Sequence, residues 1–154
     1  MLVFSDFECP ACKGFHQSVL PKISSTTKSR LNIVYLSYPL SYHKSALPAA
    51  GVAECLHKQG NLTKWGDLIF DKQDSLGVKS WSSFAQEAGF ADTTGITECA
   101  NNPRSIAKVE AAKKLVERFG VLGTPTIISN GWLFPNVPSA SRIDSAVAEY
   151  GPSK

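Results

Sequence analysis

The apolar positions at the start of the chain predict a strand followed by a helix. Residues 2–4 form a short apolar run, and a helical spacing then begins, with apolar side chains four positions apart at Phe15, Val19 and Ile23. This spacing predicts a helix from about Pro10 to Lys28. Pro21 has no N–H to donate, so we expect it to kink that helix.

A second strand is predicted shortly afterwards. Residues 31–37 are mostly apolar and β-branched, which is typical of a buried strand. Together with the first strand and the helix they make a βαβ unit, which is expected to be parallel and right-handed. Residues 38–44 then read as a loop.

The middle of the chain, residues 45–117, carries helical signals and no convincing strand. Glycines divide this stretch into short helices, each with one apolar face. The glycines are Gly60, Gly77, Gly89 and Gly95, and the faces contain Ala46, Ala49, Ala50, Ala53 and Leu56, then Leu62, Trp65, Leu68 and Ile69, then Trp81, Phe84, Ala85 and Ala88. We interpret Trp65 and Trp81 as core residues because they fall at helical spacing among other apolar side chains.

The last third of the chain reads as helix, hairpin and helix. A long helical pattern covers residues 105–119, and apolar runs at 126–129 and 132–134 flank Asn130-Gly131. An Asn-Gly pair between apolar runs predicts a β-hairpin. A final helix is predicted from about Ser139 to Tyr150.

Composition and charge narrow the class of protein. The 154 residues suffice for one domain with a core, and 43% hydrophobic with 19% charged residues is ordinary for a soluble globular protein. The net charge is only +3 and the basic residues are dispersed, which does not favour nucleic acid as a partner. No segment approaches the ~20 apolar residues of a membrane-spanning helix, and no signal peptide precedes the first strand, so the chain reads as a processed or trimmed domain.

The candidate chemistry lies at Cys9-Pro10-Ala11-Cys12, where the first strand meets the first helix. Unpaired N–H groups and the positive end of the helix dipole stabilise a thiolate at such a position, and Pro10 fits the first helical residue. Two intervening residues allow Cys12 to close a small disulfide with Cys9. The pattern therefore predicts a redox-active pair.

Two other interpretations of this pair are weaker. A zinc site needs two more ligands, commonly a second Cys-x-x-Cys or a His-x-x-x-His, and neither spacing occurs in the chain. An inert structural bridge is the second alternative. We expect no metal.

Further residues link this motif to a known family. The chain resembles the thioredoxin superfamily, and within it the DsbA-like thiol–disulfide oxidoreductases. The matching pieces are residues 3–12, Tyr38-Pro39-Leu40 with His43, Ala49-Ala50, Glu54-Cys55, Gln59-Gly60, Trp65, Gly120-Val121 and Gly123-Thr124-Pro125-Thr126. Cys-x-x-Cys alone is a weak signal, but its combination with Gly-Thr-Pro-Thr before an apolar strand is specific.

The resemblance implies an α/β, thioredoxin-like fold, a βαβ unit plus a ββα unit around a mixed sheet, with an inserted all-helical subdomain. The thioredoxin-like domain would comprise residues 1–44 and 105–154, and the helical insertion residues 45–104. Pro125 would be a cis proline facing the disulfide, and the Thr124 backbone would pair with an extended substrate. Sequence alone would not show a cis bond, because only ~5–6% of X–Pro bonds are cis, and a trans proline at the start of a strand is the alternative.

One position departs from the family pattern. Some members carry a buried acid six positions before the first cysteine, and that position is Val3 here. Proton transfer must therefore differ, through water or through Asp6 or Glu8. His43 falls on a histidine that recurs in the family, and we interpret it as structural rather than catalytic.

The leading functional hypothesis is a protein thiol–disulfide oxidoreductase, most simply a dithiol oxidase of the DsbA type. Cys9 would be the nucleophile and Cys12 the resolving cysteine, with Pro10, Ala11, Thr124 and Pro125 around them. The redox-active disulfide would replace any cofactor. An isomerase or reductase is the alternative within the class, a non-redox peptide-binding or chaperone module is the alternative outside it, and a glutathione-dependent transferase ranks last.

The same resemblance predicts the setting in which the protein works. Substrates would be proteins or peptides with thiols or disulfides, and a membrane redox partner would recycle the pair. The location would be periplasmic or otherwise extracytoplasmic, and the protein a monomer. The even number of cysteines suits an oxidising compartment, and Cys55 and Cys99 are predicted to form a structural disulfide between two helices of the insertion, two buried free thiols being the alternative.

Overall fold

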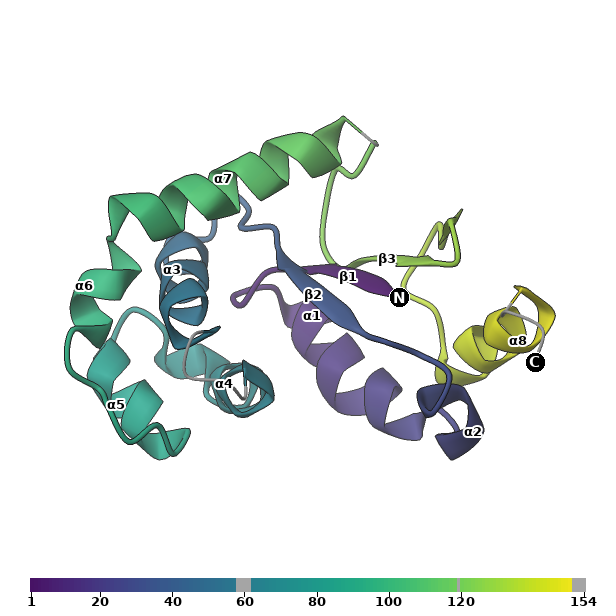
Figure 1. Ribbon diagram of the computed structural model, residues 1–154, viewed down its shortest axis with the longest axis horizontal. Coiled ribbons are helices and arrows are strands. Elements are labelled where there is room, and N and C mark those ends of the chain that lie inside the picture. Colours follow the sequence, from purple (N-terminus) through teal and green to yellow (C-terminus); the bar gives the residue numbers. More distant parts are fainter. Residues whose placement is uncertain (58–61, 119, 151–154) are drawn as a thin grey trace.

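A mixed four-stranded sheet lies at the centre of the structure, with helices on both of its faces (Figure 1). The computed structural model describes residues 1–57, 62–118 and 120–150. The strands follow the order β2-β1-β3-β4 across the sheet, where β2 is parallel to β1, and β3 is antiparallel to both β1 and β4. Their bounds are β1 Leu2–Ser5, β2 Val34–Ser37, β3 Thr126–Ser129 and β4 Trp132–Leu133.

The first helical segment is shorter and more varied than predicted. It begins as α1 (Pro10–Gly14), widens into the π-helix η1 (Phe15–Val19) and tightens into the 3₁₀ turn η2 (Leu20–Lys22). The predicted continuation to Lys28 is wrong, because Ile23 has an extended backbone. Pro21 removes one helical N–H donor at this point, and the Ser24 hydroxyl accepts the N–H of Thr27 to cap a separate helix, α2 (Ser25–Lys28).

The prediction of a buried second strand is also wrong. Only residues 34–37 form β2, because the pairing with β1 runs from Leu2 opposite Val34 to Ser5 opposite Ser37. β2 is an edge strand, and its residues Val34 and Tyr35 are 45% and 41% exposed. An apolar run does not distinguish an edge strand from a central one when the strand order of the sheet is unknown.

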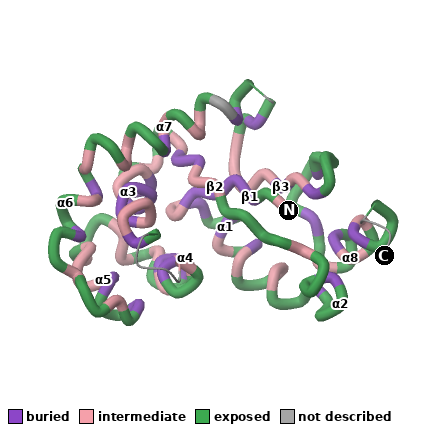
Figure 2. The backbone as a smooth tube through the Cα atoms, viewed as in Figure 1, coloured by how far each residue is buried: buried purple, intermediate pink, exposed green. Residues whose placement is uncertain are grey.

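Two apolar clusters attach the helices to the sheet, and Figure 2 shows the resulting burial along β1. The first cluster joins the α1–η1 segment and the last helix, α8 (Ala140–Tyr150), to one face: Val3, Phe15, Ile23, Ile127, Phe134, Ile143 and Val147. The second places the long helix α7 (Pro103–Glu117) on the other face: Phe4, Tyr38, Val116 and Val121. The helix predicted at 105–119 is thus confirmed with earlier bounds, and residue 119 lies outside the described residues.

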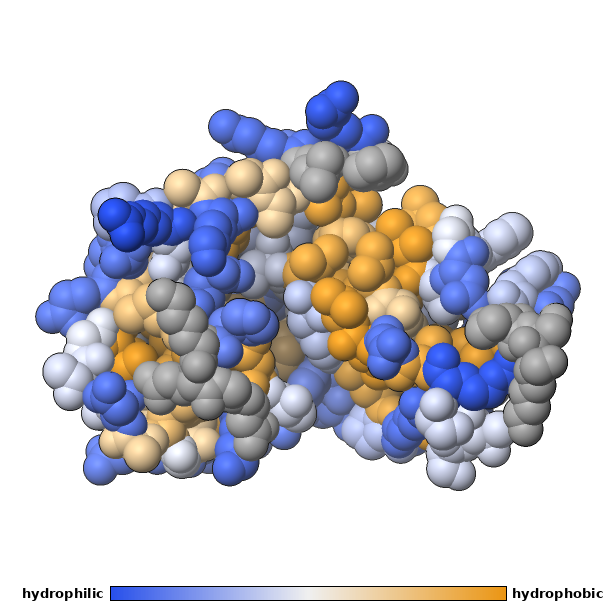
Figure 3. All heavy atoms as spheres, viewed as in Figure 1, coloured by the Kyte–Doolittle hydropathy of each residue, from blue (hydrophilic) through white to orange (hydrophobic). Residues whose placement is uncertain are grey.

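The face under α7 is covered at only one end. Leu2 pairs with both Val34 and Ile128, and Ile128 pairs with Leu133, so these four side chains form one row across the sheet. Leu2, Val34 and Leu133 are between 37% and 46% exposed. Figure 3 shows the apolar surface that gathers over the sheet on this side.

The remaining helices pack around a core of their own, on the far side of α1 from α8 (Figure 1). The predicted core role of Trp65 is confirmed, since it is 1% exposed, and Trp81 packs against it with ring centroids 6.3 Å apart. The predicted breaks at Gly77, Gly89 and Gly95 are confirmed, whereas Gly60 lies outside the described residues. The elements are α3 (Ala46–Leu56), α4 (Leu62–Asp71), η4 (Gln73–Ser75), α5 (Trp81–Glu87) and α6 (Ile96–Ala100).

The predicted hairpin joins β3 to β4. Asn130 and Gly131 form its turn with φ angles of 49° and 79°. Both angles lie in the left-handed region, which asparagine and glycine tolerate best.

Candidate active site

Cys9 lies at the junction of β1 and α1, at the residue that precedes the first helical turn. Its backbone is extended, its carbonyl accepts the N–H of Lys13 at 3.1 Å, and Pro10 occupies the first helical position. Cys9 and Cys12 are free thiols, 5% and 1% exposed respectively. Cys9 therefore has a narrow opening to solvent, whereas Cys12 is enclosed.

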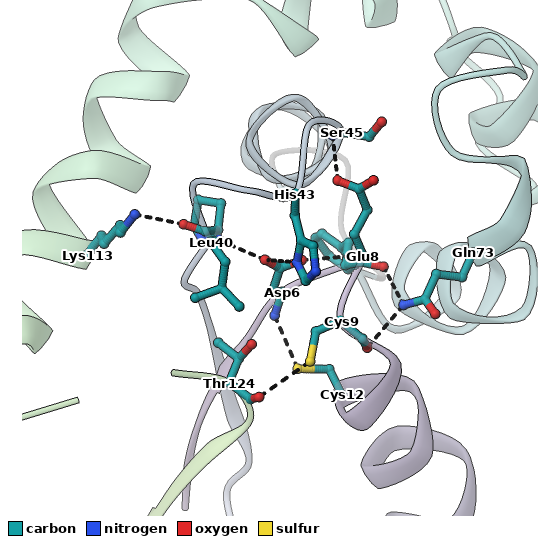
Figure 4. A network of polar contacts seen from close by, with 12 residues as sticks. Asp6, Glu8, Cys9, Cys12, Leu40, His43, Ser45, Gln73, Lys113 and Thr124 are labelled. Carbon is teal, nitrogen blue, oxygen red and sulfur yellow. Dashed lines mark hydrogen bonds and ion pairs between the residues drawn. The ribbon is translucent and has the colours of Figure 1, made fainter. Parts of the chain in front are cut away.

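The opposite wall of the site comes from a distant part of the chain. The Thr124–Pro125 peptide bond is cis, and it directly precedes β3, which pairs with β1. In its thiol form, Cys9 donates a hydrogen bond from Sγ to the carbonyl oxygen of Thr124 at 3.4 Å (Figure 4). The sheet thus brings together Cys9 and the Thr124–Pro125 turn.

The two thiols have opposite acidities. A hydrogen bond from the Cys12 thiol is the largest influence on Cys9 and lowers its pKa to about 5. Burial opposes this shift, while the Thr124 side chain and the backbone N–H groups of Cys12 and Ala11 reinforce it. The same hydrogen bond, together with burial, raises the pKa of Cys12. At neutral pH the pair therefore holds one thiolate, on Cys9, and one thiol, on Cys12.

This charge distribution gives a direct prediction. In the reduced Cys12→Ala variant we expect the pKa of Cys9 to rise from about 5 towards the ordinary thiol value of ~8.5, because the strongest donor to the thiolate is lost. The pH dependence of the ultraviolet absorbance of the thiolate measures it. Cys12→Ser, which keeps a donor, is the matched control and should retain part of the shift. An unchanged pKa in the alanine variant would show that the N–H groups of the helix dominate.

Asp6 organises the turn that holds both cysteines. Its backbone N–H contacts Cys12 Sγ at 3.4 Å, and its carbonyl accepts the N–H of Cys9 at 3.1 Å. Its buried carboxylate accepts the N–H of Glu8 at 2.7 Å, the N–H of Leu40 at 2.7 Å and a contact from His43 Nδ1 at 2.8 Å. The carboxylate therefore joins the cysteine turn to the loop after β2.

His43 fits a structural role in this arrangement. It reaches Asp6 rather than either sulfur, and its ring packs edge-on against Tyr42 with centroids 4.6 Å apart. The sequence singled out both Asp6 and His43, but it gave no signal that they form a pair.

A further contact to the cysteine turn comes from the helical insertion. Gln73 Nε2 donates to the carbonyl oxygens of Phe7 at 2.8 Å and Cys9 at 3.1 Å. Phe70 of α4 lies in one apolar cluster with Cys9 and Cys12. Sequence reasoning missed both residues, because a lone glutamine and a lone phenylalanine more than sixty positions away carry no recognisable pattern.

The other two cysteines lie away from this site. Cys55 of α3 and Cys99 of α6 form a disulfide with their Cα atoms 6.0 Å apart. The two helices approach closely beside it, since a Cβ atom placed on Gly51 would lie 2.9 Å from the carbonyl oxygen of Cys99. The bridge thus crosses a tight helix contact inside the insertion.

The described part of the chain contains neither a metal-binding cluster nor a membrane-spanning helix. Within residues 1–57, 62–118 and 120–150, no three or more His, Cys, Asp or Glu side chains gather as a group that could hold a metal ion. No helix within those ranges is both long and apolar enough to cross a membrane.

The fold and this paired-cysteine site define a class. A family model described as Thioredoxin matches residues 1–149, so the chain belongs to the thioredoxin family. This confirms the resemblance and the α/β, thioredoxin-like fold class that the sequence predicts.

The individual relatives share less than a quarter of their aligned residues with this chain. Disulfide bond formation protein D of Bacillus subtilis (strain 168) is 22% identical over 153 residues, which cover 94% of this chain and 68% of the relative. Probable disulfide bond formation protein D of Bacillus cereus is 24% identical over 139 residues, which cover 83% of this chain and 63% of the relative. The chain therefore spans about two thirds of the length of these proteins.

Solved structures share the fold over almost the whole chain. BdbD from Bacillus subtilis in its oxidised state matches with a TM-score of 0.76 and 21% identity, over 97% of this chain and 85% of BdbD. Wolbachia pipientis α-DsbA1 matches with a TM-score of 0.77 and 17% identity, over 97% of this chain and 84% of α-DsbA1.

Proposed function

We propose that the protein is a thiol–disulfide oxidoreductase that exchanges disulfides with protein or peptide substrates through Cys9 and Cys12. The observation that supports this most directly is the asymmetry of the pair: a nearly enclosed Cys12 thiol beside a Cys9 sulfur whose pKa is lowered to about 5. Exchange needs an accessible thiolate for attack and a protected partner that resolves the intermediate. The names of the two Bacillus relatives, disulfide bond formation protein D, agree with this reaction.

The reaction proceeds in two displacements. In the oxidising direction, a substrate thiolate attacks Sγ of Cys9, the Cys9–Cys12 bond breaks, and Cys12 leaves with the electron pair and takes up a proton. A second substrate thiolate then attacks the substrate sulfur of the mixed disulfide, so that the substrate is oxidised and Cys9 leaves as a thiolate. The low pKa of Cys9 makes it the better leaving group in this second step.

Neighbouring residues would present the substrate. The Thr124 carbonyl contacts Cys9 and Pro125 follows it through a cis bond, and an extended substrate would pair with the Thr124 backbone in the manner of an added strand. Pro10 and Ala11 form the exposed side of the first helical turn between the cysteines. We place the thioredoxin-like domain at residues 1–44 and 105–154, and the helical insertion that supplies Phe70 and Gln73 at residues 45–104.

The direction we favour is oxidation of substrates. At pH 7 Cys12 is a thiol both in this site and in an ordinary reduced dithiol, so it does not change the balance. The lowered pKa of Cys9 stabilises the reduced protein by about 3 kcal/mol relative to a dithiol whose cysteine has the ordinary pKa of ~8.5. For a two-electron couple this corresponds to roughly 60 mV towards a more oxidising potential. We expect a membrane redox partner to restore the disulfide and an extracytoplasmic location, with the protein acting as a monomer.

The test is a redox titration in glutathione buffers. A potential near about −120 mV would support an oxidase, and one near about −270 mV a reductase, which would overturn the proposed direction. Because the folded pKa of Cys9 is lowered, the stabilisation of the reduced protein is complete above pH ~8.5 and is lost as the pH falls through about 5. The potential should therefore become steadily less oxidising, relative to an ordinary dithiol, across that range as the pH falls.

A non-redox peptide-binding module on the same fold is the competing class. Peptide affinity measured with Cys9 and Cys12 both replaced by alanine separates the two functions. Full retention of binding together with no measurable exchange by the natural protein would favour the binding module.

A further inference from the structure

The turn that leads from β1 into α1 carries Cys9 and is held on one side by Asp6. The Asp6 carbonyl accepts the N–H of Cys9 at 3.1 Å, and the Asp6 carboxylate accepts the N–H of Glu8 at 2.7 Å. The same carboxylate fastens the turn to the loop after β2 through Leu40 and His43. All the support from this side therefore passes through one residue.

The helical insertion holds the same turn from another direction. The ring of Phe70 packs against that of Phe7 with centroids 5.5 Å apart, and the backbone N–H of Ser45 donates to Glu8 Oε2 at 2.5 Å. These two contacts reach side chains of the turn. A third contact from the insertion reaches its backbone.

Gln73 of η4 makes this backbone contact. Its Nε2 donates to the carbonyl oxygen of Phe7 at 2.8 Å and to that of Cys9 at 3.1 Å, and Figure 4 shows its side chain reaching towards the turn. A primary amide has two N–H donors, which matches the two carbonyl acceptors. The acceptors lie on either side of Glu8 in the sequence, so one side chain spans the end of the turn.

A fixed Cys9 carbonyl also fixes the position of the Cys9 sulfur. The carbonyl accepts the N–H of Lys13 at 3.1 Å, which is the first hydrogen bond of α1. The backbone of Cys9 is thus held against the first helical turn, where the Cys12 thiol and the N–H groups of Ala11 and Cys12 stabilise a negative charge on the sulfur. In addition, the positive end of the Gln73 amide dipole is directed at the residue that carries this charge.

We propose that Gln73 is a positioning residue for Cys9, through which the helical insertion stabilises the thiolate of the reduced protein and makes the Cys9–Cys12 disulfide a stronger oxidant. This inference rests on the proposed exchange reaction. The covalent steps and the two-electron balance of that reaction are unchanged, because Gln73 forms no bond to sulfur and transfers no proton. Gln73 changes the energy of one redox state, since the reduced protein carries a negative charge at Cys9 and the disulfide carries none.

The redox equilibrium distinguishes this role from a merely structural one. A contact that only holds the fold together stabilises the reduced and the oxidised protein equally, so its loss leaves the equilibrium with glutathione unchanged. A contact that favours the thiolate stabilises the reduced protein alone, and its loss shifts that equilibrium. Gln73 is only partly buried, which allows substitution without a large cavity.

The experiment equilibrates each protein with mixtures of reduced and oxidised glutathione at pH 7, and mass spectrometry after alkylation measures the fraction of oxidised protein. Gln73→Met keeps the length of the side chain and removes both donors. We expect the equilibrium constant for oxidation of glutathione by the protein to fall about threefold in this variant. The pKa of Cys9, measured by the ultraviolet absorbance of the thiolate, should rise at the same time.

Gln73→Glu keeps the shape of the side chain and brings a negative charge towards the thiolate. We therefore expect a larger fall in the equilibrium constant, about tenfold, which is roughly 30 mV for a two-electron couple. Gln73→Asn keeps the amide on a side chain one methylene shorter and should fall between the natural protein and Gln73→Met. This mildest variant keeps the test decisive if a larger change disturbs folding.

Gln86→Met and Gln86→Glu are the matched controls, because Gln86 is an exposed glutamine of α5. Both should stay within about 1.5-fold of the natural equilibrium constant, since solvent and salt screen a charge at the surface. Natural values in all three Gln73 variants would overturn the inference, whatever happens to the free energy of unfolding, as would an increase in Gln73→Glu. A natural protein that does not exchange disulfides with glutathione would instead overturn the proposed function.

Discussion

Replacing Cys9 by serine is expected to abolish disulfide exchange, with a loss of at least about a thousandfold in rate. Cys9 is the thiol with an opening to solvent and a pKa lowered to about 5, and Cys12 keeps its proton at neutral pH. A serine hydroxyl at residue 9 supplies no comparable nucleophile or leaving group. Oxidation of a peptide that contains two cysteines, followed by mass spectrometry, measures the loss.

The matched variant Cys12→Ser should behave differently. Cys9 can still attack or be attacked, but no second thiol resolves the intermediate, so covalent adducts between Cys9 and substrate should accumulate. These adducts appear on non-reducing gels and disappear with reductant. Substantial exchange by Cys9→Ser, or adducts attached at residue 12, would reverse the assignment of the two roles.

The active-site pairing could be predicted from the sequence because each half carries a local chemical signature. Cys9-Pro10-Ala11-Cys12 follows an apolar run and precedes a helical spacing, and Thr124-Pro125 precedes another apolar run. Since both apolar runs become neighbouring central strands, β1 and β3, the two signatures meet where β1 ends and β3 begins. The separation of 115 residues between Cys9 and Thr124 is bridged by strand pairing, which is what the family resemblance implies.

The cause of the low Cys9 pKa could not be predicted in the same way. The sequence favours the helix N-terminus as the source of stabilisation, whereas the thiol of Cys12 contributes most and the N–H groups of Cys12 and Ala11 contribute less. That ranking depends on how the Cys12 side chain is directed, and side-chain direction follows from packing around Phe70 and Asp6 rather than from the spacing of the motif.

The contacts that support the site were also beyond the sequence. Gln73 and the Asp6–His43 pair each join elements that are distant along the chain. Single polar residues have no periodicity, so nothing in the sequence pairs them. The edge position of β2 could not be predicted for a similar reason, because strand order is a property of the whole sheet.

Loss of the Cys55–Cys99 disulfide is expected to lower the free energy of unfolding by about 4 kcal/mol. The bridge closes a loop with a sequence separation of 44, and in the chain-entropy model a loop of this size removes about that much freedom from the unfolded chain. The loop contains α4 and α5, whose residues Trp65, Ile69 and Phe84 form the core of the insertion. Closing the short Cys9–Cys12 loop adds much less to the free energy of unfolding, so we assign the stabilising role to the Cys55–Cys99 bridge.

Urea unfolding of the Cys55→Ala/Cys99→Ala double variant measures this contribution, with Cys9 and Cys12 kept in the same redox state in both proteins. The two cysteines are only partly buried, so the alanine substitutions remove little packing beyond the bridge itself. Because α4 carries Phe70, which encloses both active-site cysteines, we also expect Cys9 to become more reactive towards alkylating agents as the insertion loosens. A decrease in the free energy of unfolding below about 1 kcal/mol, with alkylation of Cys9 unchanged, would contradict this prediction. It would mean that helix packing alone holds the insertion against the site. The close contact of α3 with α6, where a Cβ on Gly51 would lie 2.9 Å from the Cys99 carbonyl oxygen, would then be the main support.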